Sequence, residues 1–295
     1  MTGKVRVKVE DHELTLSNLT KVLYPASGFT KAEVIDYYTR TAPAMIPHLS
    51  GRPLTVKRFP NGVDGQSFFE KNAPAHTPEW VRKATLPVPG STKNRDTIDF
   101  AIIDDLPSLV YYANLAAIEF HVPMWRVDQA GRPQPPDTLV FDLDPGSPAD
   151  IVDCCRVALL LRDELDHDGL HCYPKTSGNK GMQLYVPWDR GPGTADYAKA
   201  LARRLEEAHP EVTSVMARKV RPGRVFIDWS QNNPAKTTVA PYSLRANPMP
   251  TTSTPLLWEE VETCDDAARL VFTAPDALAR VERHGDLFGP LRPAP

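Results

Sequence analysis

Cysteine is scarce in this sequence, long apolar runs are missing and neither sign of charge dominates. The four cysteines include no CxxC pair, which argues against a disulfide framework or a cysteine-bound metal. No stretch reaches the ~20 apolar residues of a membrane span, and the charged first residues lack the apolar segment of a secretory signal. The net charge of -3 argues against a wholly basic, nucleic-acid-coating surface. We therefore expect a soluble, cytoplasmic protein without a membrane partner, in which any nucleic-acid contact uses a local basic patch.

Proline, by contrast, is abundant, with 30 among 295 residues. The prolines are spread along the chain, which favours long ordered loops over a helix bundle. Strand-like and helix-like stretches are mixed without a regular βαβ rhythm, and this predicts an α+β fold. The proline-rich stretch 129–137 is expected to be an extended connection inside a single domain. It would separate an N-terminal part, 1–128, from a C-terminal part, 129–295.

Local capping signals predict where the helices begin and end. Thr30 with Glu33 has the pattern of a capping box, Ser147 before Pro148 that of an N-cap, and Gly169 would end the helix that follows. Helices are expected over about 30–48, 107–118, 147–167 and 195–208. Strands are expected over 1–16, 138–144, 171–174, 182–187 and 224–229, with short strands and turns in 51–100.

Three aspartates are the strongest candidates for chemistry. Side chains alternate along a strand, so Asp142 and Asp144 lie on one face of the expected strand 138–144. Such a pair repels itself unless one acid is protonated or a divalent cation lies between them. Asp228, in a second apolar strand, completes the oxygen-only set that Mg²⁺ or Mn²⁺ prefers in two-metal phosphoryl transfer. The alternatives are a solvated strand end for the pair and an arginine partner for Asp228.

A short loop, Ser177–Gly181, lies between two expected strands. Its glycines free the backbone to present N–H groups to an anion, and Ser177 and Lys180 add a hydroxyl donor and a positive charge. The loop therefore suits a phosphate, although its spacing differs from that of a Walker A loop. Taken alone, it is better explained as a hairpin turn with an exposed lysine.

Polar residues also gather shortly after the third aspartate, namely Gln231, Lys236, Thr237 and Arg245. Lys236 and Arg245 carry the charge needed to hold a triphosphate leaving group, and an ordinary surface loop is the alternative. His121 lies in the apolar stretch Glu119–Pro123, where a histidine is more often a core residue than a catalyst.

Cations and aromatic residues occur together in the first quarter of the chain, as Lys21, Lys31, Lys57, Arg58, Phe68, Phe69 and Lys71. Cations hold phosphates, and aromatic rings stack on bases. Because Phe68 and Phe69 are adjacent, they cannot both face one core, so at least one is expected to be exposed. The alternative is that both are buried at a bend.

Together these motifs resemble the polymerase domain of the bacterial LigD family, within the archaeo-eukaryotic primase superfamily. The resemblance extends from about Leu14 to about Leu287. It rests on Lys21–Pro25, Lys57–Arg58, Gly62–Asp64, Phe68–Lys71, Glu119–Pro123, Phe141–Pro145, Thr176–Gly178 with Lys180–Gly181, and Phe226–Gln231 through Pro241–Arg245.

The resemblance implies a primase-like fold with an RNA-recognition-like catalytic sheet. It implies template-directed addition of nucleotides, preferably ribonucleotides, to DNA gaps or ends in non-homologous end joining, with Ku and a DNA ligase as partners at the bacterial nucleoid. Asp142, Asp144 and Asp228 would hold two Mn²⁺ or Mg²⁺ ions. The nucleoside triphosphate would contact Lys57, His121, Ser177, Lys180, Gln231, Thr237 and Arg245. The DNA-binding set would be Lys21 and Lys31 at a 5′-phosphate, Asn18 near them, Phe68 and Phe69 against the template, and Lys71.

One position departs from the family pattern S-G-x-K-G-L-H. Gln183 stands where the family has a histidine that reaches the nucleotide's phosphates. Glutamine donates a hydrogen bond but carries no charge, which would cost about 1.5–3 kcal/mol of phosphate stabilisation. We therefore expect reduced but measurable activity, and a gain in rate or nucleotide affinity for Gln183→His.

Two other functions fit parts of the sequence. A DNA-end-binding module that has lost catalysis would explain Gln183, but the three intact acids argue against it. A haloacid-dehalogenase-type phosphatase would explain Phe141–Pro145, although Gly-Thr is expected after its second aspartate and a βαβ rhythm around it. The sequence has neither a ligase nucleophile motif nor room for one, as expected of a stand-alone relative or an excised domain.

Overall fold

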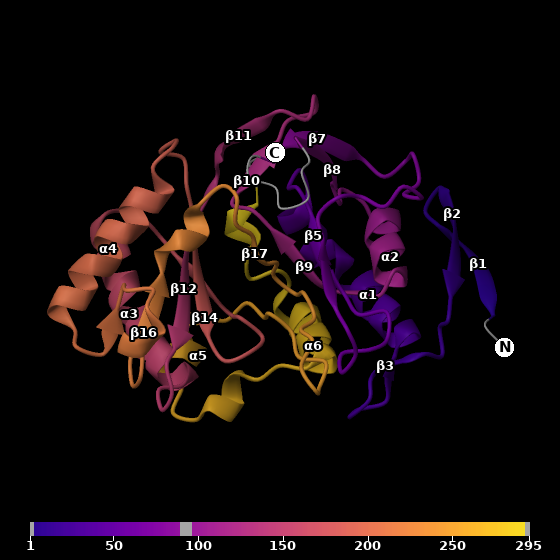
Figure 1. Ribbon diagram of the computed structural model, residues 1–295. Coiled ribbons are helices and arrows are strands. Elements are labelled where there is room, and N and C mark those ends of the chain that lie inside the picture. Colours follow the sequence, from indigo (N-terminus) through magenta and orange to yellow (C-terminus); the bar gives the residue numbers. More distant parts are fainter. Residues whose placement is uncertain (1–2, 89–95, 293–295) are drawn as a thin grey trace.

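Two β-sheets, one on each side of the molecule, form the framework of the protein (Figure 1). The structure is a computed structural model that describes residues 3–88 and 96–292. The first two residues of the strand expected at 1–16, and residues 89–95 of the stretch 51–100, lie outside the described residues. Helices and antiparallel strands are mixed without βαβ units around the catalytic candidates, so the α+β prediction is confirmed.

The chain begins with a hairpin where one strand was expected. Strands β1 (Lys4–Val9) and β2 (His12–Ser17) pair antiparallel, and Glu10 turns the chain with a φ of 51°. Alternation of polar and apolar residues continues through such a turn, which is why the pattern did not reveal it. A second small hairpin, β3 (Val22–Tyr24) and β4 (Phe29–Thr30), follows.

Helix α1 (Lys31–Leu49) starts where its capping box predicted. The Thr30 hydroxyl accepts from the Glu33 N–H at 3.3 Å, and the Glu33 carboxylate accepts from the Thr30 N–H at 2.7 Å. Helix α2 (Leu106–Asn114) is shorter than expected. Ala116 adopts a φ of 57°, which ends the helical conformation, and the residues after it join a sheet instead.

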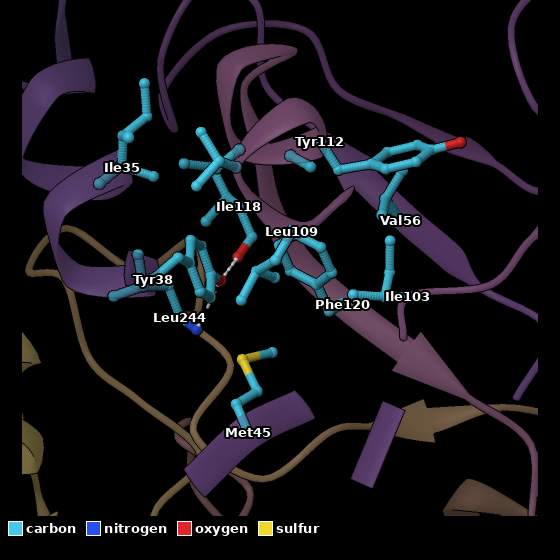
Figure 2. Close-up of a cluster of buried hydrophobic side chains, with 14 of the residues drawn as sticks. Ile35, Tyr38, Met45, Val56, Ile103, Leu109, Tyr112, Ile118, Phe120 and Leu244 are labelled. Carbon is cyan, nitrogen blue, oxygen red and sulfur yellow. Dashed lines mark hydrogen bonds between the residues drawn. The ribbon is translucent and has the colours of Figure 1, made fainter. Parts of the chain in front are cut away.

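The four-stranded sheet lies against α1 and α2. Its strands, in order across the sheet, are β17 (Thr238–Val239), β9 (Ala117–Val122), β5 (Thr55–Arg58) and β6 (Phe68–Glu70). Figure 2 shows the buried core beneath it, in which Tyr38, Phe120 and Met45 meet. Because Val56 and Phe120 point into this core, their strand neighbours point to the opposite face. That face carries Lys57 and His121.

The same core also anchors a distant segment. The Tyr38 hydroxyl donates to the Ile118 carbonyl at 2.5 Å and accepts from the Leu244 N–H at 3.0 Å (Figure 2). Tyr37 donates to the Tyr242 carbonyl at 2.6 Å, and Tyr24 to the Arg245 carbonyl at 2.9 Å. Three buried tyrosines of the N-terminal part therefore hold the backbone of 242–245.

Small hairpins complete the N-terminal part. One joins β7 (Lys83–Pro87) and β8 (Thr97–Ala101), and another joins β10 (Trp125–Val127) and β11 (Pro133–Pro136). The stretch 129–137 is thus extended, as predicted, but part of it is paired. The division of the chain into 1–128 and 129–295 stays a prediction. Strand β17 belongs to the second of these parts but pairs with the sheet of the first.

The five-stranded sheet carries the acidic residues. Its strands, in order, are β13 (Tyr173–Thr176), β14 (Met182–Pro187), β12 (Thr138–Pro145), β16 (Val225–Asp228) and β15 (Val212–Thr213). All neighbours are antiparallel except β15 and β16. An antiparallel strand on each side of β12 is incompatible with the phosphatase interpretation, which needs parallel neighbours.

Helices cover one face of this sheet. Leu139, Phe141 and Leu143 of β12 pack against α3 (Ile151–His167) and α4 (Thr194–Ala208), as the alternation predicted. Helix α3 begins later than expected because Asp150, paired with Asp153 in a capping box, is its N-cap in place of Ser147. Gly169 follows its end with a φ of 71°.

The C-terminal segment returns across the molecule. Helix α5 (Trp258–Glu262) packs on α3, and α6 (Ala274–His284) packs on α1 (Figure 1). Among the residues that the structure describes, no helix combines the length and the apolar character that crossing a membrane would demand.

Candidate active site

Four polar side chains form a row across the face of the five-stranded sheet opposite α3 and α4. The register places Lys175 opposite Gln183, Gln183 opposite Asp142, and Asp142 opposite Asp228. Residues directly opposite in antiparallel strands share a face, with Cβ atoms about 4.5–5.5 Å apart. Asp144 lies two residues farther along β12 on the same face. The three predicted acids are therefore brought together at the centre of the sheet.

Burial and mutual repulsion oppose ionisation of the acids. Burial, together with the charges of Asp144 and Asp228, raises the pKa of Asp142 to about 7, although the Gln183 amide donates to its Oδ1 at 3.0 Å. Burial and Asp228 also raise the pKa of Asp144, while Arg221 and Lys180 act in the opposite direction. A cation placed on this face would relieve the repulsion.

Asp228 is held by neighbours on its own turn. Its Oδ1 accepts from the Ser230 N–H at 3.0 Å, and its Oδ2 accepts from the Gln231 amide at 3.0 Å. The Lys236 amino group lies 4.0 Å from Oδ2 and also donates to the Ser230 hydroxyl. Within the described residues its ion-pair partner is this lysine, so the alternative of an arginine partner is wrong.

The donor set fits a hard divalent cation. Three carboxylates on adjacent strands offer only oxygen, which Mg²⁺ and Mn²⁺ prefer over nitrogen or sulfur. Within residues 3–88 and 96–292, no three His, Cys, Asp or Glu side chains are arranged to hold a metal ion. The carboxylates of Asp142 and Asp228 instead accept hydrogen bonds from separate donors.

A second group of side chains lies on the face of β5 and β9 opposite the core of Figure 2. The register places Lys57 opposite Glu119, and His121 follows two residues along β9. The Glu119 Oε2 atom lies 2.9 Å from the His121 Nε2 and 3.6 Å from an Arg245 Nη1. Burial alone would raise the pKa of Glu119, but the His121 hydrogen bond and the Arg245 charge lower it to about 2. Burial lowers the pKa of His121 despite the Glu119 charge, which favours the neutral imidazole.

Arg245 retains unused hydrogen-bonding capacity. Its Nε is buried, and among the described residues it has no hydrogen-bond partner. The same is true of the Nε of Arg221, whose guanidinium lies 3.7 Å from the ring centroid of Phe226, opposite Asp144. A buried donor without a partner costs free energy, so such groups mark positions where a ligand oxygen is favoured. Arg221 flanks the acidic face, and Arg245 lies with Glu119 on the β5–β9 side.

The loop Ser177–Gly181 packs tightly between β12 and the segment 251–252. A Cβ on Gly178 would lie 2.7 Å from the Thr252 backbone, and a Cβ on Gly181 would lie 2.3 Å from the Leu143 carbonyl oxygen. The Ser177 hydroxyl accepts from the Gly181 N–H at 3.1 Å. The glycines are therefore needed for packing, and Lys180 is exposed at the tip, where its charge acts on Asp144.

Phe68 and Phe69 are both exposed, with 44% and 58% of their surface accessible. The alternative that both are buried at a bend is wrong. Arg58 lies 5.3 Å from the Phe68 ring centroid on one face of β6. On the other face, Phe69 is 5.8 Å from the His121 ring and 5.6 Å from the Lys57 amino group. Phe69 thus lies at the edge of the β5–β9 face, and Phe68 points away from that face.

Comparison with known proteins identifies the family. The family profile described as LigD, primase-polymerase domain, matches residues 30–288. The chain belongs to this LigD family. It is 44% identical over 287 residues to the multifunctional non-homologous end joining DNA repair protein LigD of Mycobacterium tuberculosis, and 32% identical over 281 residues to the bifunctional LigD of Bacillus subtilis. Each alignment covers 94% of this chain, but only 37% and 44% of those proteins.

A solved structure has the same fold. The polymerase domain from Mycobacterium tuberculosis Ligase D in complex with DNA superposes with a TM-score of 0.89 at 43% sequence identity. The match covers 96% of this chain and 99% of that one. The predicted resemblance to the LigD polymerase domain is therefore confirmed. This chain spans between about a third and a half of the length of the curated LigD relatives named above.

Within this LigD fold, the predicted residues fall into two places. The first surrounds the acidic row and the β5–β9 face. These two groups are neighbours: the charges of Arg245 and Lys175 both lower the pKa of His121, and the Tyr185 hydroxyl of β14 hydrogen-bonds the Thr238 hydroxyl of β17 at 2.6 Å. Thr237 lies beside that contact. The second is an N-terminal basic pocket at Lys21 and Lys31, with exposed Asn18 at its edge. Lys71 is also exposed, but no contact ties it to either place among the described residues.

The basic pocket is built from two lysines that hold backbone carbonyls. Lys21 donates to the Pro60 carbonyl at 2.5 Å, and Lys31 to the Ser17 carbonyl at 2.6 Å. Burial lowers the pKa of Lys31 to about 8, with contributions from the charges of Lys21 and Arg58. Positive charge concentrated in this way is suited to a phosphate dianion.

Sequence reasoning missed Glu119, Lys175 and Arg221. Glu119 shares the face of His121, so alternation along β9 could have revealed it. Lys175 could be found only from the pairing of β13 with β14, because its neighbours in the row come from other strands. Arg221 lies just before β16, and only its contact with Phe226 places it at the acids.

Proposed function

We propose that this chain is a template-directed nucleotidyltransferase that adds nucleotides, preferably ribonucleotides, to DNA ends and short gaps during break repair. The observation that carries the proposal is that Asp142, Asp144 and Asp228 share one face of the paired strands β12 and β16, where burial and mutual repulsion favour a bound cation. The fold match to a polymerase domain in complex with DNA supports DNA as the substrate. The proposed partners are gapped DNA with a 5′-phosphate, nucleoside triphosphates, Ku and a DNA ligase.

Asp142, Asp144 and Asp228 would hold two Mn²⁺ or Mg²⁺ ions. When bound, these ions lower the pKa of an attacking hydroxyl and neutralise charge on the phosphates. Arg245 and Lys180 would bind the triphosphate and stabilise the charge that develops on the leaving group. Ser177, Gln231, Lys236 and Thr237 remain proposed nucleotide contacts. No side-chain general base is required.

The β5–β9 face would receive the nucleotide itself. The neutral His121 imidazole donates its one N–H to the ionised Glu119, so its other ring nitrogen is free to accept a hydrogen bond from a sugar hydroxyl without adding a charge. Lys57 lies between the rings of Phe59 and Phe69, at 5.1 and 5.6 Å from their centroids, which fixes its amino group near this face. Phe69 offers its ring for stacking against a base, and Phe68 would contact the template.

Primer extension on a short-gapped, 5′-phosphorylated duplex tests this function. We expect template-matched extension with Mn²⁺, faster with ribonucleotides than with deoxyribonucleotides. Extension that ignores the template base would contradict the proposal. So would the absence of incorporation with either metal while DNA binding persists, and that outcome would favour the non-catalytic end-binding module.

The Lys31 pocket predicts a pH-dependent preference for 5′-phosphorylated gaps. The protonated amino group binds phosphate, and its pKa of about 8 means that this charge is lost as pH rises from 7 to 9. The phosphate stays a dianion over that range because its second pKa is about 6. We therefore expect the preference for 5′-phosphate over 5′-hydroxyl to shrink with rising pH in gel-shift titrations.

Lys31→Met should lower the preference by about tenfold at pH 7, since a hydrogen bond to a charged group contributes roughly 1.5–3 kcal/mol. The variant should also lose the pH dependence. Lys8→Met, which removes an exposed lysine on β1, serves as the matched control and should behave like the wild type. An unchanged 5′-phosphate preference in Lys31→Met would place the phosphate elsewhere.

A further inference from the structure

The amide of Gln183 bonds to protein groups through both its nitrogen and its oxygen. Its Nε2 donates to Asp142 Oδ1 at 3.0 Å, and its Oε1 accepts from the Lys175 amino group at 2.6 Å. Only 4% of Gln183 is exposed, and Lys175 is completely buried. The side chain therefore connects a buried lysine to an acid.

Lys175 is an unusual residue to bury. Its amino group donates to the Ser253 hydroxyl at 2.6 Å and lies 5.3 Å from the ring centroid of Tyr185. Ser253 donates its own proton to the Thr176 carbonyl at 2.8 Å, so it accepts from the lysine. Within the described residues, no carboxylate lies within ion-pair distance of Lys175. Burying an amino group among neutral acceptors is costly, and an apolar side chain would fill the same space more cheaply.

The hydrogen-bond chemistry gives this lysine a specific effect. The Lys175 amino group donates to the carbonyl oxygen of the Gln183 amide, and when protonated it has no lone pair that could accept the amide N–H instead. The amide N–H group is then directed at Asp142, where it holds Oδ1 and leaves Oδ2 for another ligand. Ser253 fixes the lysine from behind. The row Lys175–Gln183–Asp142 thereby sets the orientation of the carboxylate.

We propose that Lys175 is a positioning residue for the metal ligand Asp142, acting through Gln183. The inference rests on the proposed function, in which Asp142 binds a divalent cation. It gives Gln183 a role different from phosphate binding: it orients an acid. Groups that orient a metal ligand typically change metal affinity by 10–100-fold when they are removed.

A titration with Mn²⁺ in the absence of nucleotide and DNA tests the proposal. Electron paramagnetic resonance measures the free ion at each step. Lys175→Met keeps the length of the side chain but removes its donors, and Gln183→Leu removes the amide. We expect each variant to weaken Mn²⁺ binding about tenfold. Because the two residues act in series, the double variant should be no weaker than either single variant. In extension assays the loss should appear in the Mn²⁺ concentration needed for half-maximal rate, with kcat largely recovered at saturation.

Controls separate positioning from folding. Lys199 also lies over an aromatic ring, at 4.8 Å from the Trp229 centroid, but bonds no member of the row, so Lys199→Met should bind Mn²⁺ like the wild type. If Lys175→Met does not fold, Ser253→Ala removes the anchor of the lysine, together with the hydrogen bond of that serine to the Thr176 carbonyl, and should weaken Mn²⁺ binding about threefold.

Unchanged Mn²⁺ affinity in a folded Lys175→Met, or losses that multiply in the double variant, would overturn the positioning role, and so would a wild type that binds no Mn²⁺. An unchanged affinity in Ser253→Ala would overturn it as well if Lys175→Met does not fold. A protein that adds no nucleotide, yet loses Mn²⁺ affinity in Lys175→Met, would refute the proposed function and leave this inference standing.

Discussion

Asp142→Asn is expected to reduce nucleotide addition by at least about 10³-fold, because the metal ions contribute several kcal/mol and each 1.36 kcal/mol is tenfold in rate. Asp142 is the central acid of the row, opposite both Gln183 and Asp228. An asparagine there keeps the shape of the side chain but removes the charge that would bind a cation. Single-turnover primer extension at saturating nucleotide measures the effect.

DNA binding by Asp142→Asn should remain within about twofold of the wild type, because the proposed DNA-phosphate contacts lie elsewhere. Mn²⁺ should raise the melting temperature of the wild type more than that of the variant, since a ligand stabilises the state that binds it. Asp163→Asn, on an exposed face of α3, is the matched control and should extend primers normally. Extension at the wild-type rate by Asp142→Asn would refute the metal role.

Gly181→Ala is expected to destabilise the protein by about 2–3 kcal/mol, at the upper end of the usual cost of overpacking. The added Cβ would lie 2.3 Å from the Leu143 carbonyl oxygen, and that oxygen belongs to a buried central strand that cannot retreat freely. The loop and β12 must therefore separate. Urea denaturation measures the change in the free energy of unfolding.

In the same variant, the rate of nucleotide addition should fall by more than the loss of folded protein explains. Leu143 lies between Asp142 and Asp144, so any shift of its backbone moves both acids. Gly289→Ala is the matched control, because a Cβ there meets nothing within 4 Å and its φ lies outside the left-handed region. A Gly181→Ala protein with wild-type stability and rate would show that the loop adapts and that its glycines are not needed for packing.

Local patterns predicted those features that depend on neighbours in sequence. Alternation placed Asp142 and Asp144 on the face opposite Leu143, and a capping box located the start of α1. Chain reversals without glycine were missed, because Glu10 and Ala116 adopt positive φ values that their residue types do not suggest.

Features that depend on strand pairing were beyond local patterns. Nothing near Asp228 in sequence shows that it pairs with Asp142, and Lys175 joins the row only through the register of β13, β14 and β12. The needs of a two-metal site grouped the three acids, and the resemblance to a family gave them the same role. It did not supply the partners of Gln183, because the glutamine itself departs from that family's pattern.

The hydrogen bonds from buried tyrosines to residues 242–245 determine when during folding the candidate active site is complete. Tyr24, Tyr37 and Tyr38 come from the first 38 residues, yet they position the backbone that carries Arg245. The acids and the arginine are thus assembled only when the two halves of the chain have folded against each other. A nascent or partly unfolded chain could still display its carboxylates, but it would lack an aligned arginine. Complete folding is therefore a condition for assembling the whole site.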